Sequence, residues 1–248
     1  MQIPWLETHN ALPPPESAQK IGSELAGLVA AGGGLSTRRL MEAYRLGIFP
    51  WYSDGQPILW WSPDPRMVLK TADFRLHRSL RKRIQRFIQD PNCEVRIDSA
   101  FSEVIHHCAH SFRKGQPGTW IVSDMINAYQ ALHEAGFAHS VETWIQGKLV
   151  GGLYCVAIGH AVFGESMFTR ESDASKIALA ALVAFARAHD IQWIDCQQNT
   201  KHLSSLGGRE MPRKAFLDQL HSTQKECSFS WSFNPVFWST LELSTVQT

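Results

Sequence analysis

This chain of 248 residues carries little excess charge of either sign and has no long apolar run. Its formal net charge is only +1, so any contact with nucleic acid must come from a local patch rather than from the field of the whole molecule. The longest unbroken apolar run, 177–186, is shorter than the roughly 20 residues that a membrane-spanning helix needs. The proline-rich residues 1–20 contain no apolar signal-peptide core. We therefore expect no role at a membrane.

Cysteines are few, scattered and odd in number, and no two of them form a Cys-x-x-Cys pair. The five are Cys93, Cys108, Cys155, Cys196 and Cys227. A disulfide framework would need an even set at regular spacing, so this pattern favours a reducing, cytoplasmic setting. His106 and His110 are one helical turn apart, but no third and fourth ligand follow at a recognisable spacing. We expect a polar helix face there and no metal.

The sequence also lacks the common cofactor and hydrolase motifs. Neither the phosphate-binding loop ending in Gly-Lys-Ser/Thr nor the dinucleotide motif Gly-x-Gly-x-x-Gly occurs. Gly164-Glu165-Ser166 has no closing glycine, so a nucleophilic serine elbow is disfavoured. We expect no cofactor.

The order of elements indicates an α+β fold. Apolar and polar residues alternate in three segments that are separated by turns at 146–147 and 159–160, namely 140–145, 148–158 and 161–167. A helix over 174–189 follows, and then a short strand that ends at Asp195. Hairpins followed by a helix and a strand predict a mixed sheet with helices packed on it.

A basic face marks a second predicted helix, which begins near Phe74. Its apolar residues recur at helical spacing: Leu76, Leu80, Ile84, Phe87 and Ile88. Its remaining face carries Arg78, Arg81, Lys82 and Arg86. Such a face is a solvated surface by default. Together with the tryptophans at 51, 60 and 61 it also suits an RNA footprint, since phosphates need cations and unstacked bases need aromatic planes. Both interpretations stay open, and those tryptophans form either a core or a stacking surface.

Polar residues stand at the ends of two apolar strands. Asp195 and Gln197 are two residues apart, and alternation along a strand predicts that both point the same way. Glu165 closes another apolar run, so the two carboxylates can line one cavity. A carboxylate beside an amide suits an amine that attacks a carbonyl. The plainer alternative is a polar fringe at a strand end.

Together, several of these segments resemble the leucyl/phenylalanyl-tRNA–protein transferases. The matching segments run in family order from about residue 25 to 220: 43–51 (AYRLGIFPW), 59–66 (LWWSPDPR), 118–121 (GTWI), 138–142 (AHSVE), 164–168 (GESMF), 174–176 (ASK), 194–197 (IDCQ), 205–207 (SLG) and 211–213 (MPR). Single matches of this length would be weak, but their order makes the resemblance specific.

The resemblance implies a small N-terminal domain, 1–68, and a larger domain, 69–248, of the acyl-CoA N-acyltransferase type. It implies transfer of Leu or Phe, and sometimes Met, from aminoacyl-tRNA to proteins with an N-terminal Arg or Lys, which marks them for degradation. The tRNA ester is already activated, so neither ATP nor metal is required. We expect a monomer.

The resemblance also implies roles for single residues. Trp51 and Trp120 correspond to positions that contact the terminal adenosine, and Asp195 and Gln197 to positions that act on the acceptor amine. The resemblance places Glu165 in the same cavity. From the same match we expect Leu153, Ser166, Leu182 and Ile194 to bind substrate, and the basic helix to bind tRNA. We further predict that Glu165 and Asp195 form an acidic wall, with Asp195 nearer to the amine.

Two other functions compete with this hypothesis. An acyl-CoA N-acyltransferase of the same fold would need a glycine-rich loop for the pyrophosphate, whereas the connection 168–173 has no glycine and carries two acids. A non-catalytic RNA-binding module would leave the polar residues at 165, 195 and 197 unexplained. The sequence therefore favours an aminoacyltransferase.

Overall fold

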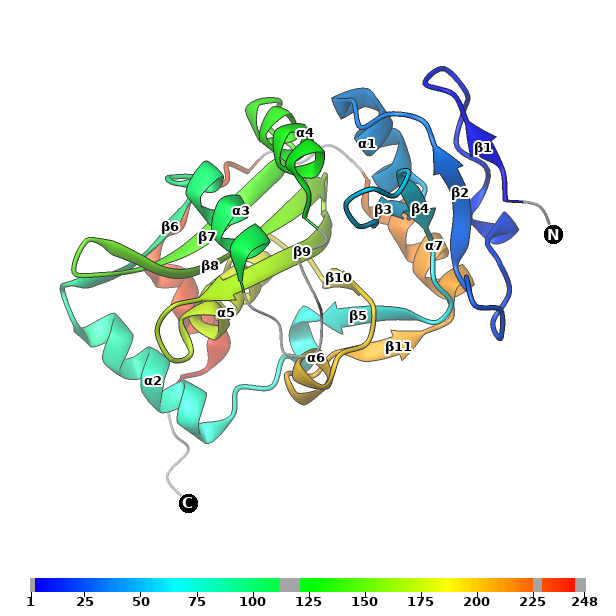
Figure 1. Ribbon diagram of the computed structural model, residues 1–248. Helices are drawn as coiled ribbons and strands as arrows, with labels where there is room; N and C mark the ends of the chain where they lie inside the picture. Colours follow the sequence, from blue (N-terminus) through cyan, green and yellow to red (C-terminus); the bar gives the residue numbers. More distant parts are fainter. Residues whose placement is uncertain (1–2, 112–120, 225–228, 244–248) are drawn as a thin grey trace.

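The chain folds around two separate β-sheets, which lie side by side in Figure 1. The computed structural model describes residues 3–111, 121–224 and 229–243. Four short strands from the N-terminal part form the smaller sheet, and seven strands from Arg66 onwards form the larger one. At this coarse level the structure is a mixture of helices and strands with a separate N-terminal part, as the sequence predicted.

The smaller sheet has the order β1-β2-β4-β3. Its strands are β1 (Trp5–Leu6), β2 (Leu28–Gly32), β3 (Phe49–Pro50) and β4 (Leu59–Trp61). Helix α1 (Thr37–Arg45) begins where the Ser36 hydroxyl accepts a hydrogen bond from the Arg39 amide, as expected of a capping serine. Trp60 is fully buried and donates to the Gly32 carbonyl at 2.9 Å, so this tryptophan belongs to the core.

The larger sheet has the order β11-β5-β10-β9-β8-β7-β6. Its strands are β5 (Arg66–Lys70), β6 (Cys93–Ile97), β7 (Ala138–Ile145), β8 (Lys148–Ile158), β9 (Ala161–Thr169), β10 (Trp193–Gln197) and β11 (Arg209–Met211). Strands β7, β8 and β9 pair antiparallel through the two predicted turns, which confirms the hairpins. Strand β10 returns parallel to β9 after a helical crossover, so the ends of these two strands meet.

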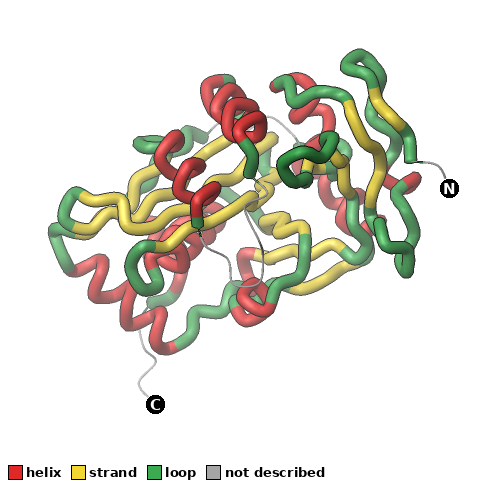
Figure 2. Tube along the Cα trace, in the orientation of Figure 1, coloured by secondary structure: helices red, strands yellow, loops and turns green. Residues whose placement is uncertain are grey.

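Helices cover both faces of the larger sheet, as the red tubes of Figure 2 show. They are α2 (Arg78–Gln89), α3 (Phe101–His110), α4 (Ser123–Glu134), α5 (Ala174–Ala188), α6 (Lys201–Ser205) and α7 (Arg213–Thr223). Short 3-10 turns are η1 (Pro15–Ser17), η2 (Thr71–Asp73) and η3 (Pro235–Leu241). Helices α3 and α4 pack into one apolar cluster and α5 into another, with the sheet between them.

The basic helix α2 begins later than the sequence predicted. Residues 71–73 form a 3-10 turn, and the helix starts at Arg78 instead of Phe74. Leu80, Ile84 and Phe87 are buried, which confirms the core of the apolar face. Ile88 is 41% exposed although its neighbour Phe87 is buried, so the apolar face ends before the last residues of the helix.

The chain returns to its N-terminal part near its end, so the two parts interlock. Helix α7 packs against the turn after α1, where a Cβ on Gly47 would lie 2.6 Å from Leu217 and 2.9 Å from Phe216. Strand β5, at 66–70, is paired wholly within the larger sheet, so a boundary at residue 68 falls inside a strand. The same apolar cluster contains residues of both parts.

Glycine at 151 sets how closely α5 approaches the sheet. A Cβ built there would lie 2.5 Å from the Ala174 Cβ and 2.8 Å from the Ala174 carbonyl carbon, at the start of α5. Gly151→Ala should therefore lower the free energy of unfolding by about 1–3 kcal/mol, because backbone atoms must move. Urea unfolding measures this change.

The matched control is Gly34→Ala, where an added Cβ would meet only Thr8, at an ordinary 3.5 Å. This substitution should change the unfolding free energy by less than about 1 kcal/mol. Equal losses in the two variants would show that the contact with Ala174 does not hold α5 in place.

Candidate active site

A cavity of about 440 Å³ opens where the two sheets meet. Its lining comes from β3 and the loop after it, from β8, β9, β10 and α5, and from the segment leading into α6. Trp51, Leu153, Ser166, Leu182 and Ile194, which the sequence grouped as substrate-binding residues, all contribute to this lining. Trp120 lies outside the described residues.

The floor of the cavity is apolar. Leu153, Met167, Leu179, Leu182 and Ile194 supply it from two strands, the helix α5 and the end of β10. Such a surface binds an apolar side chain by removing it from water, and a few polar groups then fix its orientation.

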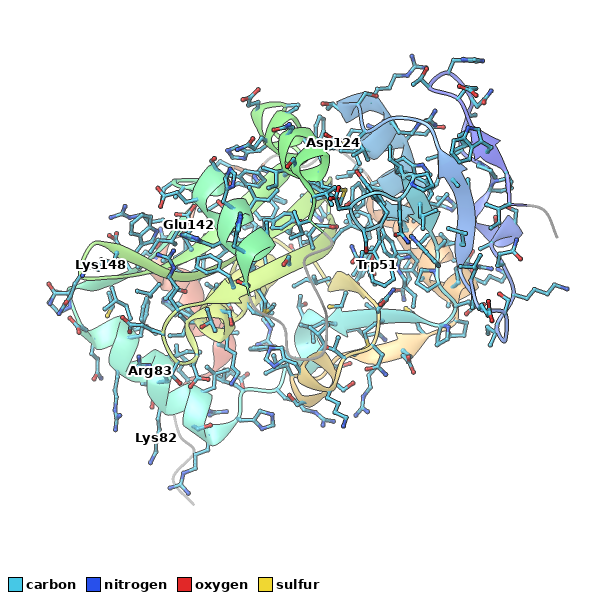
Figure 3. All side chains as sticks on the ribbon, viewed as in Figure 1. Trp51, Lys82, Arg83, Asp124, Glu142 and Lys148 are labelled. Carbon is cyan, nitrogen blue, oxygen red and sulfur yellow. The ribbon has the colours of Figure 1, made fainter. Side chains whose placement is uncertain are left out.

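Trp51, which is labelled in Figure 3, lines the cavity. Its ring meets Trp61 edge-on, with centroids 5.8 Å apart, and Trp61 Nε1 donates to the Trp51 carbonyl at 2.7 Å. Both indoles are half-buried. A fixed and partly exposed indole of this kind can stack on a flat ring.

Glu165 brings a carboxylate into the cavity and is held by three donors. Tyr44 OH donates to Oε1 at 2.7 Å, Gln197 Nε2 donates to the same oxygen at 2.8 Å, and Tyr129 OH donates to Oε2 at 3.2 Å. Burial raises the pKa of Glu165 to about 7, against the hydrogen bond from Tyr44, and the charge of Asp195 adds to the rise. The carboxyl therefore titrates near neutral pH.

Asp195 lies behind the cavity instead of lining it. Arg66 Nε donates to Oδ1 at 2.9 Å and Nη2 to Oδ2 at 2.6 Å, and both side chains are fully buried. The guanidinium also donates to the Gly47 carbonyl at 3.1 Å and lies over the rings of Phe49 and Phe216. This bidentate pair fixes the Asp195 carboxylate firmly.

The expectation that Asp195 and Gln197 share a face was wrong. The register of β10 against β5 shifts between these two residues, and Gln197 has a φ of +62°. This bulge turns the Gln197 side chain into the cavity beside Glu165, and Ile194 and Cys196 also line the cavity. The expected order of the acidic wall, with Asp195 in front, also differs from the structure. Asp195 contacts the site through Gln197, whose backbone N–H donates to Asp195 Oδ1 at 2.9 Å.

The basic face of α2 lies well away from this cavity, as the labels on Lys82 and Trp51 in Figure 3 show. Arg78, Lys82 and Arg86 are exposed, and Arg81 is partly covered by its bond to the Glu242 carbonyl. The face is therefore open to solvent along the helix.

Two further features can be stated for the described part of the chain. There, no group of three or more His, Cys, Asp or Glu side chains is placed to hold a metal ion. Among the same residues, none of the helices has the length and apolarity needed to cross a bilayer.

Sequence reasoning missed four residues of the site: Arg66, Tyr44, Tyr129 and His202. Arg66 and Tyr44 fall within segments of the family match, but nothing in their spacing marks them as buried partners of a carboxylate. No motif or spacing on the helix that carries Tyr129 marks it as a residue of the site. His202 lines the cavity from α6, and burial lowers its pKa, with the charge of Lys176 contributing.

An apolar floor beside a fixed amide and a carboxylate is an arrangement for acyl transfer to an amine. The chain belongs to the leucyl/phenylalanyl-tRNA protein transferase family: the family's main model matches residues 68–221 and the model of its N-terminal domain matches 33–64.

Individual proteins called leucyl/phenylalanyl-tRNA–protein transferase are similar over almost the whole chain. The one from Polaromonas sp. is 58% identical over 95% of this chain and 92% of its own length. That of Albidiferax ferrireducens is 58% identical over 96% and 94%, and that of Leptothrix cholodnii is 57% identical over 96% and 95%. A crystal structure of a Bacteroides thetaiotaomicron protein of unknown function is similar at only 16% identity and a TM-score of 0.39, which is too low for any argument.

The buried ion pair behind the site should be essential to stability. Arg66→Met removes the cation that pairs with the buried Asp195 carboxylate and should lower the unfolding free energy by about 3–5 kcal/mol. The double variant with Asp195→Leu should recover most of this loss, because no unpaired charge is then buried. Urea unfolding of the four proteins in this cycle gives the coupling.

The control is Lys214→Met, which breaks the exposed pair with Asp218. Exposed pairs contribute less than about 1 kcal/mol. If Arg66→Met proved as mild as this control, the pair would not be the anchor that its geometry indicates.

Proposed function

We propose that this chain transfers Leu or Phe from aminoacyl-tRNA to the N-terminal Arg or Lys of acceptor proteins. The product carries a new peptide bond and a new N-terminal residue that marks it for N-end-rule degradation. The observation that carries the proposal is the cavity in which an apolar floor meets Glu165 and Gln197. Family membership supports the same activity.

In this proposal the donor lies across the cavity. Its amino-acid side chain occupies the floor formed by Leu153, Leu182 and Ile194, next to Ser166, and its terminal adenosine stacks on Trp51. Trp120 is the second stacking residue, on the family match alone. The ester carbonyl then faces the polar wall.

The polar wall holds the amine and the ester together. The ester is already activated, so the protein has to orient the amine and stabilise the oxyanion. Gln197 supplies an amide at the reacting groups. Asp195 acts from behind, since it holds the Gln197 backbone at 2.9 Å and is itself fixed by Arg66. Asp195 is thus a positioning residue, while Gln197 and Glu165 touch substrate.

The acceptor brings positive charge, from its Arg or Lys side chain and from its α-ammonium. Glu165 offers a carboxylate in a partly buried place, where a charge interaction is stronger than in water. This favours cationic N-termini over neutral ones.

The basic face of α2 provides the tRNA contact in this proposal. Lys82 on α2 and Trp51 lie on different parts of the molecule in Figure 3, so in this proposal Arg78, Arg81, Lys82 and Arg86 bind phosphates away from the terminal adenosine. The donor also implies a cytoplasmic protein.

At the level of fold, we propose that the larger sheet with its helices adopts the acyl-CoA N-acyltransferase architecture, and that the N-terminal part before β5 is a small domain attached to it. The hairpins β7–β9, the crossover helix α5 and the parallel return of β10 support this. We expect one chain to suffice for activity.

Single-turnover transfer of labelled Phe from tRNA tests the function directly. The parent protein should label an Arg-initiated peptide and not an otherwise identical Ala-initiated one. Gln197→Ala should slow the transfer at least about tenfold, the loss expected for one missing hydrogen bond in the transition state. Gln192→Ala, a change at an exposed position just before β10, serves as the control. Absence of transfer by the parent would refute the proposed function.

The basic face is tested by the salt dependence of aminoacyl-tRNA binding. Replacing its four cations by Ala should flatten the slope of log affinity against log salt by about 3, which is roughly 0.7–0.9 for each lost phosphate contact. Leu and Phe donors should lose affinity equally, because phosphates carry no information about the amino acid.

Single changes provide the matched comparison. Lys82→Ala should reduce the slope by somewhat less than about 1, while Lys148→Ala, at another exposed lysine, should leave it unchanged. An unaltered slope in the fourfold variant would leave α2 as an ordinary solvated surface.

A further inference from the structure

Three oxygen-bearing groups form a closed ring at the back of the cavity. Tyr44 comes from α1, Tyr129 from α4 and Glu165 from β9. Each tyrosine hydroxyl lies within hydrogen-bond distance of one carboxylate oxygen, and the two hydroxyls also contact each other. Both tyrosines are fully buried, whereas Glu165 lines the cavity. Substrate therefore reaches the ring only at the carboxyl.

The ring has one more contact than the ionised state has protons. Two phenols bring two protons, but three oxygen–oxygen contacts must be bridged. In the ionised state both phenols donate to the carboxylate, so the contact between the two hydroxyls has no proton to bridge it. A third proton on Oε2 completes the ring, and each group then donates once.

The groups around the ring decide which member titrates. Burial raises the pKa of both tyrosines well above the ordinary value, so they keep their protons. Other groups that face the ring or its carboxyl are Tyr154 and Cys155 from β8, Asp195 with its partner Arg66, and Gln197. Burial raises the pKa of Glu165 to about 7, so its carboxyl titrates near neutral pH.

The proposed transfer releases one proton. The acceptor α-ammonium has three hydrogens on nitrogen; one stays in the new amide and one goes to the ribose oxygen that leaves. The C–N bond forms, the ester C–O bond breaks, and the remaining proton needs an acceptor within reach of the amine. An α-amino group titrates near 7.7–8.0, so an acceptor that titrates close to neutrality is well matched.

We propose that Glu165 is this proton acceptor, and that Tyr44 and Tyr129 are positioning residues that complete the ring around the proton it takes up. The proposal rests on the proposed function. It gives Glu165 a second task besides attracting the cation: the ionised carboxylate receives the acceptor, and the protonated carboxyl is what remains once the amine has reacted. The proton then leaves through the cavity before the next turnover.

The first test compares the parent with Glu165→Gln. The amide cannot take up a proton, but its NH2 and carbonyl can occupy the same ring as the protonated acid. Peptide kcat/KM, measured with saturating Phe-tRNA from about pH 5 to about pH 9, should fall by about a hundredfold or more, and its acid limb should follow the peptide's own α-amino group, near 7.7–8.0, instead of Glu165. An acid limb that stays near pH 7 in this variant overturns the proposal.

Stability provides a readout that does not need activity. Because the folded pKa of Glu165 is raised, the parent should lose stability as pH rises from the ordinary value near 4.5 through about 7. Glu165→Gln should lack this loss, so its melting temperature should match the parent's at low pH and exceed it at high pH. If Glu165→Gln melts below the parent at every pH, the amide does not replace the protonated carboxyl in the ring, and the proposed ring is contradicted.

The tyrosines are tested together by Tyr44→Phe with Tyr129→Phe. Two apolar rings around the carboxyl disfavour its ionised form, so the acid limb should move upward by about one pH unit or more. The double variant should then be about tenfold slower than the parent below the limb and nearly equal to it above. A uniform loss at every pH would mean that the hydroxyls are merely structural.

Two controls separate the proposal from its rivals. Tyr52→Phe removes another buried hydroxyl, one with no hydrogen-bond partner among the described residues, and should leave the limb in place. His202→Gln removes the other cavity group that could take up the proton. Loss of the limb in this variant would make His202 the acceptor instead of Glu165. If the parent transfers no Phe at all, the proposed function fails, while the pH dependence of stability still tests the ring.

Discussion

The buried guanidinium of Arg66 is the point on which both the fold and the site depend. It lies at the start of β5, where the larger sheet begins, and binds Asp195 in the middle of β10. Its remaining nitrogen holds the Gly47 carbonyl, and its flat faces meet rings from β3 and α7. One side chain thereby joins the smaller sheet, the larger sheet and the returning helix.

This anchoring explains why the site can tolerate a strained turn. Gln197 adopts a left-handed backbone conformation, which costs of order 1–3 kcal/mol and persists only when its surroundings enforce it. The Asp195 carboxylate accepts a hydrogen bond from the backbone N–H of Gln197, and Arg66 keeps that carboxylate in place. Asp195 thus fixes the backbone of the bulge. The side-chain amide of Gln197, which enters the cavity, is fixed in turn by its hydrogen bond to Glu165.

Local patterns predicted much of the fold. The alternation over 140–167, the turns within it and the apolar stripe of α2 each depend on nearby residues, and each corresponds to an observed element. The ordered family match also predicted which residues gather at the cavity, Leu182 and Ser166 among them. Pattern reasoning works here because these signals arise within a few residues of one another.

The remainder depends on contacts between distant segments. Alternation placed Asp195 and Gln197 on one face, and only the pairing of β10 with β5 reveals the bulge between them. Tyr44 and Glu165 are 121 residues apart, so nothing local could indicate their bond. Trp120 lies outside the described residues, and its role stays a prediction.

Part of the apolar floor of the cavity lies on other elements than the strands that carry the polar groups. Its floor includes α5 and β8 residues such as Leu182 and Leu153, whereas Glu165 and Gln197 stand where β9 and β10 meet. The two can therefore change separately. Reshaping the floor would redirect the protein to other apolar amino acids, including synthetic ones, without disturbing the polar groups. A protein with a reshaped floor would then attach a different residue to the N-terminus of an acceptor protein.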